Sequence, residues 1–108
     1  MLIGFNEWST IGVAYAIKEL NLNNKVFGIG FDSNVNCVNM LESGEIDTLI
    51  VQNPFSMGYT SVSKASEILS GKKSQTSTIE TDTYVVTRKK MFSPDIQKIL
   101  FSFSESSN

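Results

Sequence analysis

The apolar run at residues 25–31, KVFGIGF, constrains the fold more than any other feature of the sequence. Its side chains do not alternate between apolar and polar, so it does not resemble a strand with one face in water. Such a run is typical of a strand in a parallel sheet that helices cover on both faces. It therefore predicts an α/β fold, a three-layer sandwich with a mainly parallel sheet.

Strand-like and helix-like segments alternate along the rest of the chain. The other predicted strands are residues 2–5, 47–51 and 83–87. Apolar residues at helical spacing predict helices over residues 9–20, 34–43 and 54–70, and a short last helix from Pro94. Polar residues 72–78 are predicted to form a loop, and residues 102–108 a frayed tail. This order favours a parallel sheet with right-handed crossovers.

The helical spacing also predicts which residues face the core. The first helix would bury one apolar stripe and the second another. These stripes are Ile11, Ala14, Ile17 and Leu20, and Val35, Val38 and Leu41. Gly44 is predicted to end the second helix. Asn53 and Pro54 are predicted to start the third, as a cap residue followed by proline at the first helical position.

Composition excludes several classes of function. The 108 residues suffice for one small domain. The formal net charge is −2 and the basic residues are dispersed, which argues against nucleic-acid binding by this chain. With one cysteine and no histidine, a Cys/His zinc site and histidine-based catalysis are excluded, and no cofactor is expected. Cys37 is interpreted as a buried apolar residue. No run is long enough to span a membrane, and no signal peptide is visible.

Three polar side chains follow three predicted strands where each strand ends. They are Asn6, Asp32 and Gln52. Because ligands of parallel α/β sheets bind at the carboxyl ends of the strands, we expect these residues on one rim. A carboxylate acceptor and two amides suit a ligand with vicinal hydroxyls. Trp8 would add an aromatic face to such a sugar site.

Each of these residues also has a purely structural interpretation. Asn6 with Ser9 would cap the first helix, and Asp32 the second. Gln52 would satisfy loop backbone, and Trp8 would pack on the domain. Glu7 and Asp32 form a conceivable carboxylate pair for glycoside hydrolysis, but their separation is not fixed by the sequence.

The chain resembles the C-terminal part of a type I periplasmic-type solute-binding protein, the sugar-binding group that includes ribose-binding proteins and LacI-type effector domains. The segments that carry this resemblance are FNEWSTIGVAYAIKEL, KVFGIGFDS, LESGEIDTLIVQNPFSMGY, ASEILSGKK and TDTYVVTRKKMFSPDIQKIL. They follow the family's order and spacing and cover nearly the whole chain. The resemblance implies that Asn6, Asp32 and Gln52 contact a sugar.

The resemblance also implies a division into lobes. Residues 1–52 and 83–108 would belong to the C-terminal lobe. Residues 53–82 would be a hinge-crossing segment of the N-terminal lobe. The family's chains are far longer than 108 residues, so the sequence is expected to be a piece of such a protein with half of the ligand cleft. Free sugar would then bind weakly.

The expected function is the sugar-binding component of an ABC importer, not an enzyme. Its partners would be a sugar or polyol and, in the full-length protein, the transporter permease. The full-length protein would lie outside the cytoplasm. The alternatives are the effector domain of a LacI-type repressor and the sugar sensor module of a receptor kinase. The apolar stripe on the helix after Pro54 also predicts self-association.

Overall fold

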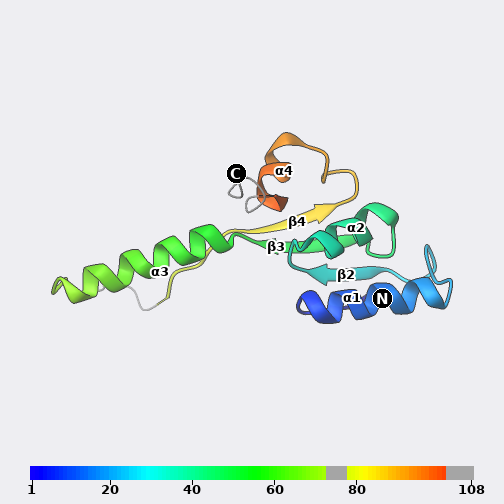
Figure 1. Cartoon of the computed structure of the whole chain (residues 1–108), viewed down its shortest axis with the longest axis horizontal. Coiled ribbons are helices and arrows are strands. Elements are labelled where there is room, and N and C mark those ends of the chain that lie inside the picture. Colours follow the sequence, from blue (N-terminus) through cyan, green and yellow to red (C-terminus); the bar gives the residue numbers. More distant parts are fainter. Residues whose placement is uncertain (73–77, 102–108) are drawn as a thin grey trace. The chain divides into compact units, whose positions relative to one another are not determined.

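The computed structural model describes residues 1–72 and 78–101. Its elements, in chain order, are β1 (Leu2–Ile3), α1 (Glu7–Glu19), β2 (Gly28–Phe31), α2 (Val35–Ser43), β3 (Thr48–Gln52), α3 (Pro54–Leu69), β4 (Thr83–Thr87) and α4 (Pro94–Leu100) (Figure 1). Every predicted helix and strand is present. The predicted frayed tail and most of the predicted polar loop lie outside the described residues.

The chain divides into two compact units. Unit 1 contains Met1–Val51 and the described residues from Tyr84 onward, whereas unit 2 contains Gln52–Thr83. Unit 1 holds the sheet and its covering helices, and unit 2 is dominated by α3.

The sheet has four strands in the order β1-β2-β3-β4. The β1–β2 pair is parallel, with Leu2 opposite Gly28, and the β2–β3 pair is parallel, with Ile29 opposite Thr48. Figure 1 draws the β4 arrow opposite in direction to β2. The predicted α/β fold with a mainly parallel sheet is therefore confirmed.

The core of unit 1 forms where α1 and α2 pack together and α1 packs on β2. The residues that α1 buries are Thr10, Ala14 and Ile17, and those that α2 buries are Cys37, Val38 and Leu41. The predicted stripes were wrong at their ends, since Leu20 is 67% exposed and Val35 is 63% exposed. The interpretation of Cys37 as a buried residue is confirmed.

The ends of α2 and α3 follow from local backbone chemistry. Gly44 ends α2 in the left-handed region at φ 92°, a conformation that glycine adopts without steric cost. At the start of α3, the Asn53 side chain accepts a hydrogen bond from the Ser56 N–H at 3.0 Å, and Pro54 occupies the first turn. Both predicted boundaries are confirmed. Helix α3 itself buries none of its residues.

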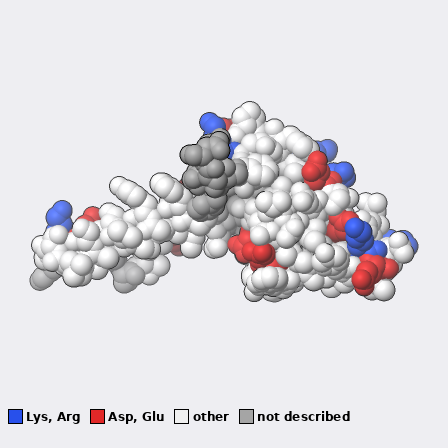
Figure 2. All heavy atoms as spheres, viewed as in Figure 1, with Lys and Arg blue, Asp and Glu red and all other residues white. Residues whose placement is uncertain are grey.

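Charged side chains are mixed over the visible surface. In Figure 2 acidic and basic groups lie close together over unit 1. No helix within residues 1–72 and 78–101 is long and apolar enough to cross a membrane.

Candidate functional site

The structure places the predicted ligand residues at the ends of consecutive strands. Asn6 lies between β1 and α1, Asp32 directly follows β2, and Gln52 is the last residue of β3. Because β1, β2 and β3 are parallel, these positions all lie at or just beyond carboxyl ends of strands. Asn6 and Asp32 lie in unit 1, whereas Gln52 begins unit 2. The Asn6–Asp32 rim of unit 1 is therefore the candidate site.

Asn6 caps α1, as its structural interpretation predicted. Its Oδ1 atom accepts hydrogen bonds from the Ser9 N–H at 2.9 Å and from the Ser9 hydroxyl at 2.8 Å. The Asn6 N–H in turn donates to Ser9 Oγ at 3.1 Å, which completes a capping box. The amide oxygen is thus engaged, and the exposed side chain can offer a ligand its two N–H donors.

Asp32 has a different role from the cap that its sequence position suggested. Asn34 caps α2, with its Oδ1 atom accepting from the Asn36 N–H at 2.7 Å. Asp32 instead adopts φ 77°, a left-handed conformation that is uncommon outside glycine. Its N–H donates to the Ile50 carbonyl of β3 at 3.0 Å, which holds this backbone. Its half-exposed carboxylate makes no hydrogen bond to any residue in the described part of the chain, so both oxygens can accept from a ligand.

Aromatic residues flank these two polar residues in the sequence. Trp8, in the first turn of α1, is 78% exposed, so the interpretation that it packs on the domain was wrong. Phe5 is 75% exposed and lies beside Phe31, with ring centroids 6.0 Å apart. The sequence analysis missed this pair, although each Phe directly precedes a predicted ligand residue. Exposed aromatic faces beside polar groups suit the apolar faces of sugar rings.

The rim also carries negative charge. Burial and, to a smaller extent, the charges of Glu7 and Asp32 together raise the pKa of Cys37 to about 11. Both carboxylates therefore act on this end of α2. A carboxylate acceptor beside amide donors favours a neutral hydroxylated ligand over an anion.

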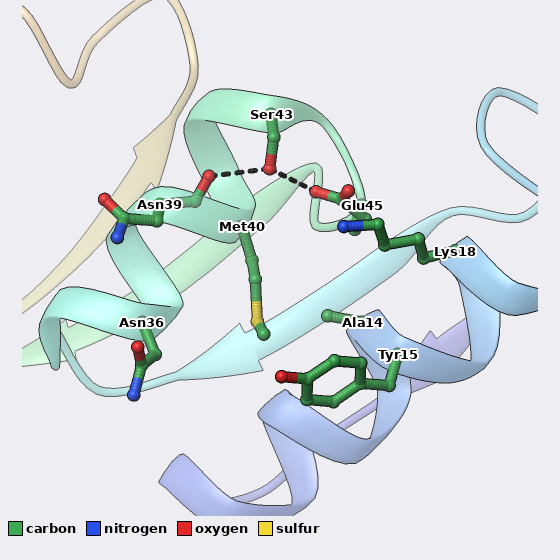
Figure 3. Close-up of a pocket in the computed structure, with 8 residues that line it drawn as sticks. All are labelled: Ala14, Tyr15, Lys18, Asn36, Asn39, Met40, Ser43 and Glu45. Atoms are coloured by element: carbon green, nitrogen blue, oxygen red, sulfur yellow. Dashed lines mark hydrogen bonds between the residues drawn. The ribbon is translucent and has the colours of Figure 1, made fainter.

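A separate groove lies between α1 and α2 (Figure 3). It has a volume of about 180 Å³, and Tyr15, Lys18, Asn36 and Met40 are among its lining residues. On its α2 side, the Ser43 hydroxyl donates to the Asn39 carbonyl at 2.7 Å and contacts the Glu45 carboxylate. None of the four predicted ligand residues lines this groove. It is distinct from the strand-end rim.

Comparisons with known proteins fit this geometry. The family model for a periplasmic binding protein domain matches residues 1–73. A comparison with curated proteins gave no match. A carbohydrate transporter solute binding protein from Agrobacterium radiobacter, solved with D-arabinose, is 35% identical over 91% of this chain, with a TM-score of 0.81.

Two further solved structures are similar over most of the chain. An ABC transporter solute binding protein from Agrobacterium vitis, solved with bound D-fucose, is 30% identical over 90% of the chain, with a TM-score of 0.79. The XylFII–LytSN complex contains a chain that is 27% identical over 82% of this one, with a TM-score of 0.71. The matches cover only 33%, 33% and 30% of those three chains.

The family match spans most of the described sheet and helices, and the solved structures share the fold over nearly the whole chain. This chain spans about a third of the length of the chains in these two solved structures. The resemblance seen in the sequence is thus confirmed: the chain belongs to the periplasmic binding protein family, with a partial type I fold.

Proposed function

We propose that this chain is part of the sugar-binding component of an ABC importer, with Asn6, Asp32 and Gln52 as polar ligand contacts and Trp8 as an aromatic contact. Support comes from similar solved structures that hold D-arabinose and D-fucose. The partners would be a sugar or polyol and the transporter permease. The full-length protein would act outside the cytoplasm.

The observation that carries this proposal is that Asn6 presents hydrogen-bond donors, whereas Asp32 presents hydrogen-bond acceptors. The Asn6 oxygen is occupied by the α1 cap, so its side chain presents donors. The Asp32 carboxylate presents only acceptors when ionised. A sugar hydroxyl can accept from the amide while it or its neighbour donates to the carboxylate. Two adjacent hydroxyls would therefore match this rim better than a single charged group.

The two units support a proposal about lobes. Unit 2 spans Gln52–Thr83, close to the expected hinge-crossing segment at residues 53–82. In this proposal residues 1–52 and 83–108 belong to one lobe, and α3 belongs to the other. Gln52 would then sit at a hinge, where it contacts the ligand as the lobes close.

The main alternative within the family is a sensor. The XylFII–LytSN complex shows that a similar chain can assemble with another protein. A LacI-type effector domain is the third possibility. The coding sequence in frame upstream of Met1 tests these three roles. A signal peptide or a lipid-anchored lobe there would favour transport or sensing. A helix-turn-helix would favour repression.

Trp8 provides a direct test of the rim because it is the single tryptophan of the chain. We expect its fluorescence to change on titration with D-arabinose or D-fucose. Asp32→Asn should raise the dissociation constant about tenfold, because a charge-assisted hydrogen bond becomes a neutral one. Asp95→Asn is the matched control, since Asp95 is an exposed carboxylate in the first turn of α4. Equal affinities for the two variants would contradict the proposed role of Asp32.

A further inference from the structure

Thr10 is the one polar residue among those that α1 buries, and it is fully buried. Its hydroxyl donates to the Asn6 carbonyl at 2.8 Å, four residues earlier. The same oxygen accepts a hydrogen bond from the Phe31 N–H at 2.9 Å, from a residue 21 positions away. One hydroxyl therefore connects the residue that caps α1 to the residue before Asp32.

The bond to Phe31 replaces a strand partner that the sheet lacks. On the β1 side, the last pairing joins Ile3 to Ile29, and the Gly4 N–H donates to the Ile29 carbonyl at 2.9 Å. The chain then turns into α1, so no strand is available to the Phe31 N–H on this side. Thr10 Oγ1 accepts from it instead. Beyond Phe31, the Asp32 N–H is held from the other side by the Ile50 carbonyl.

Two glycines permit this close approach. A Cβ atom on Gly4 would lie 2.4 Å from the Thr10 nitrogen, and one on Gly30 would lie 2.3 Å from Thr10 Cγ2. Both distances are far inside van der Waals contact, so any larger residue would push α1 away from the strand ends. The close packing thus fixes the start of α1 against β1 and β2.

We propose that Thr10 is a positioning residue for the ligand rim: its hydroxyl sets Asn6 and Asp32 relative to each other by bonding the backbone of Asn6 and of Phe31, the residue directly before Asp32. This inference rests on the proposed sugar-binding function. Thr10 itself is buried and would not touch the sugar. Its effect on affinity would pass through the Asn6 carbonyl and the Phe31 N–H.

A purely structural role would involve the methyl group as much as the hydroxyl. The methyl packs against Gly30, whereas the hydroxyl makes the bonds to the rim. Three substitutions separate the two groups. Thr10→Ser keeps the hydroxyl and removes the methyl, Thr10→Val keeps the shape and removes the hydroxyl, and Thr10→Ala removes both.

The test measures three quantities on the full 108-residue chain: denaturant stability, amide hydrogen exchange at Phe31, and Trp8 fluorescence during titration with D-arabinose and D-fucose. We expect Thr10→Ser to bind within about twofold of the wild type even if it is less stable. Thr10→Val and Thr10→Ala should bind about fivefold to tenfold more weakly, as expected for a lost hydrogen bond. Phe31 exchange should accelerate in both by more than their loss of global stability explains.

Wild-type affinity in Thr10→Val or Thr10→Ala would overturn the inference, as would an equal loss of binding in Thr10→Ser and Thr10→Ala. If Thr10→Val does not fold, the Thr10→Ser and Thr10→Ala variants still show whether the hydroxyl affects sugar affinity, because they differ from each other only in that hydroxyl. A wild-type chain that responds to neither sugar would contradict the proposed function and, with it, any role of Thr10 in binding. Amide hydrogen exchange at Phe31 would still show whether the Thr10 hydroxyl fixes the rim. A failure of the proposed sugar-binding function is therefore distinguishable from a failure of the proposed role of Thr10.

Discussion

At the scale of single residues, Cys37 shows how strongly the fold changes an ionisable group. Its side chain, in the first turn of α2, is fully buried. Burial, followed by the charges of Glu7 and Asp32, raises the thiol pKa from 9.0 to about 11. The unfolded chain therefore loses this proton at a lower pH than the folded chain does. Deprotonation then favours unfolding as the pH rises from about 9 to about 11.

Cys37→Ala should remove this part of the pH dependence. Well below pH 9 the thiol is protonated in both states and contributes almost no slope. Between about pH 9 and 11 the wild type should lose up to about 1.4 kcal/mol of unfolding free energy per pH unit more than the variant does. Urea unfolding at pH 8, 9.5 and 10.5 measures this difference, and the comparison cancels the titration of lysines and tyrosines. Parallel curves for the two proteins would contradict the raised pKa.

The positions of the predicted ligand residues and the Asn6 cap of α1 were predictable, but the backbone conformation of Asp32 and the cap of α2 were not. Asn6 and Asp32 were predicted from one rule, that strands of a parallel sheet end on the same rim. The rule does not say that Asn6 Oδ1 is used by Ser9, or that Asp32 has φ 77° while Asn34 caps α2. Those details depend on where the backbone turns. Thr10 was missed because a polar residue in a helix does not count toward an apolar stripe.

At the scale of secondary-structure elements, the helices and the bounds of the last strand, Thr83–Thr87, were predicted well, whereas the first two strands are shorter than expected. The strand expected over residues 25–31 is only Gly28–Phe31, because the Lys25 and Val26 N–H groups donate back to the Leu22 carbonyl in a turn. The first strand is likewise shorter than the expected residues 2–5, since the α1 cap begins at Asn6. In both cases the local backbone conformation at the end of the strand limits its length.

Helix α3 has an apolar stripe that no described residue buries. Phe55, Tyr59, Val62 and Leu69 recur at helical spacing, and each is at least 70% exposed. An open stripe of this kind favours association with the same stripe of a second copy. We therefore expect a dimer or larger species at high protein concentration.

Val62→Glu should shift this equilibrium toward monomer, because it places a charge in the middle of the stripe. Ser61→Glu is the matched control, since it adds the same charge one position away, off the stripe. Light scattering after size-exclusion chromatography measures the mass of each variant. A wild-type chain that stays monomeric at high concentration, or equal effects of the two substitutions, would contradict association through α3.

At the scale of the whole molecule, the chain covers about a third of its solved relatives. In the proposed function, Asn6 and Asp32 of unit 1 would contact a ligand from one side only. Without closure over the ligand, little of the sugar would be removed from water. We therefore expect weak binding, well above micromolar dissociation constants, even though the polar groups on the rim are in place.

An amide-resolved NMR titration of the wild-type chain with D-arabinose tests the central claim most directly. It reports both the affinity and the residues that respond. The account predicts a weak, saturable response, in which the largest shifts occur at Asn6, Trp8, Asp32 and Gln52. The groove between α1 and α2, around Tyr15 and Asn36, should respond little. Shifts centred on that groove, micromolar binding or no saturable response would contradict a rim that forms half of a sugar-binding cleft.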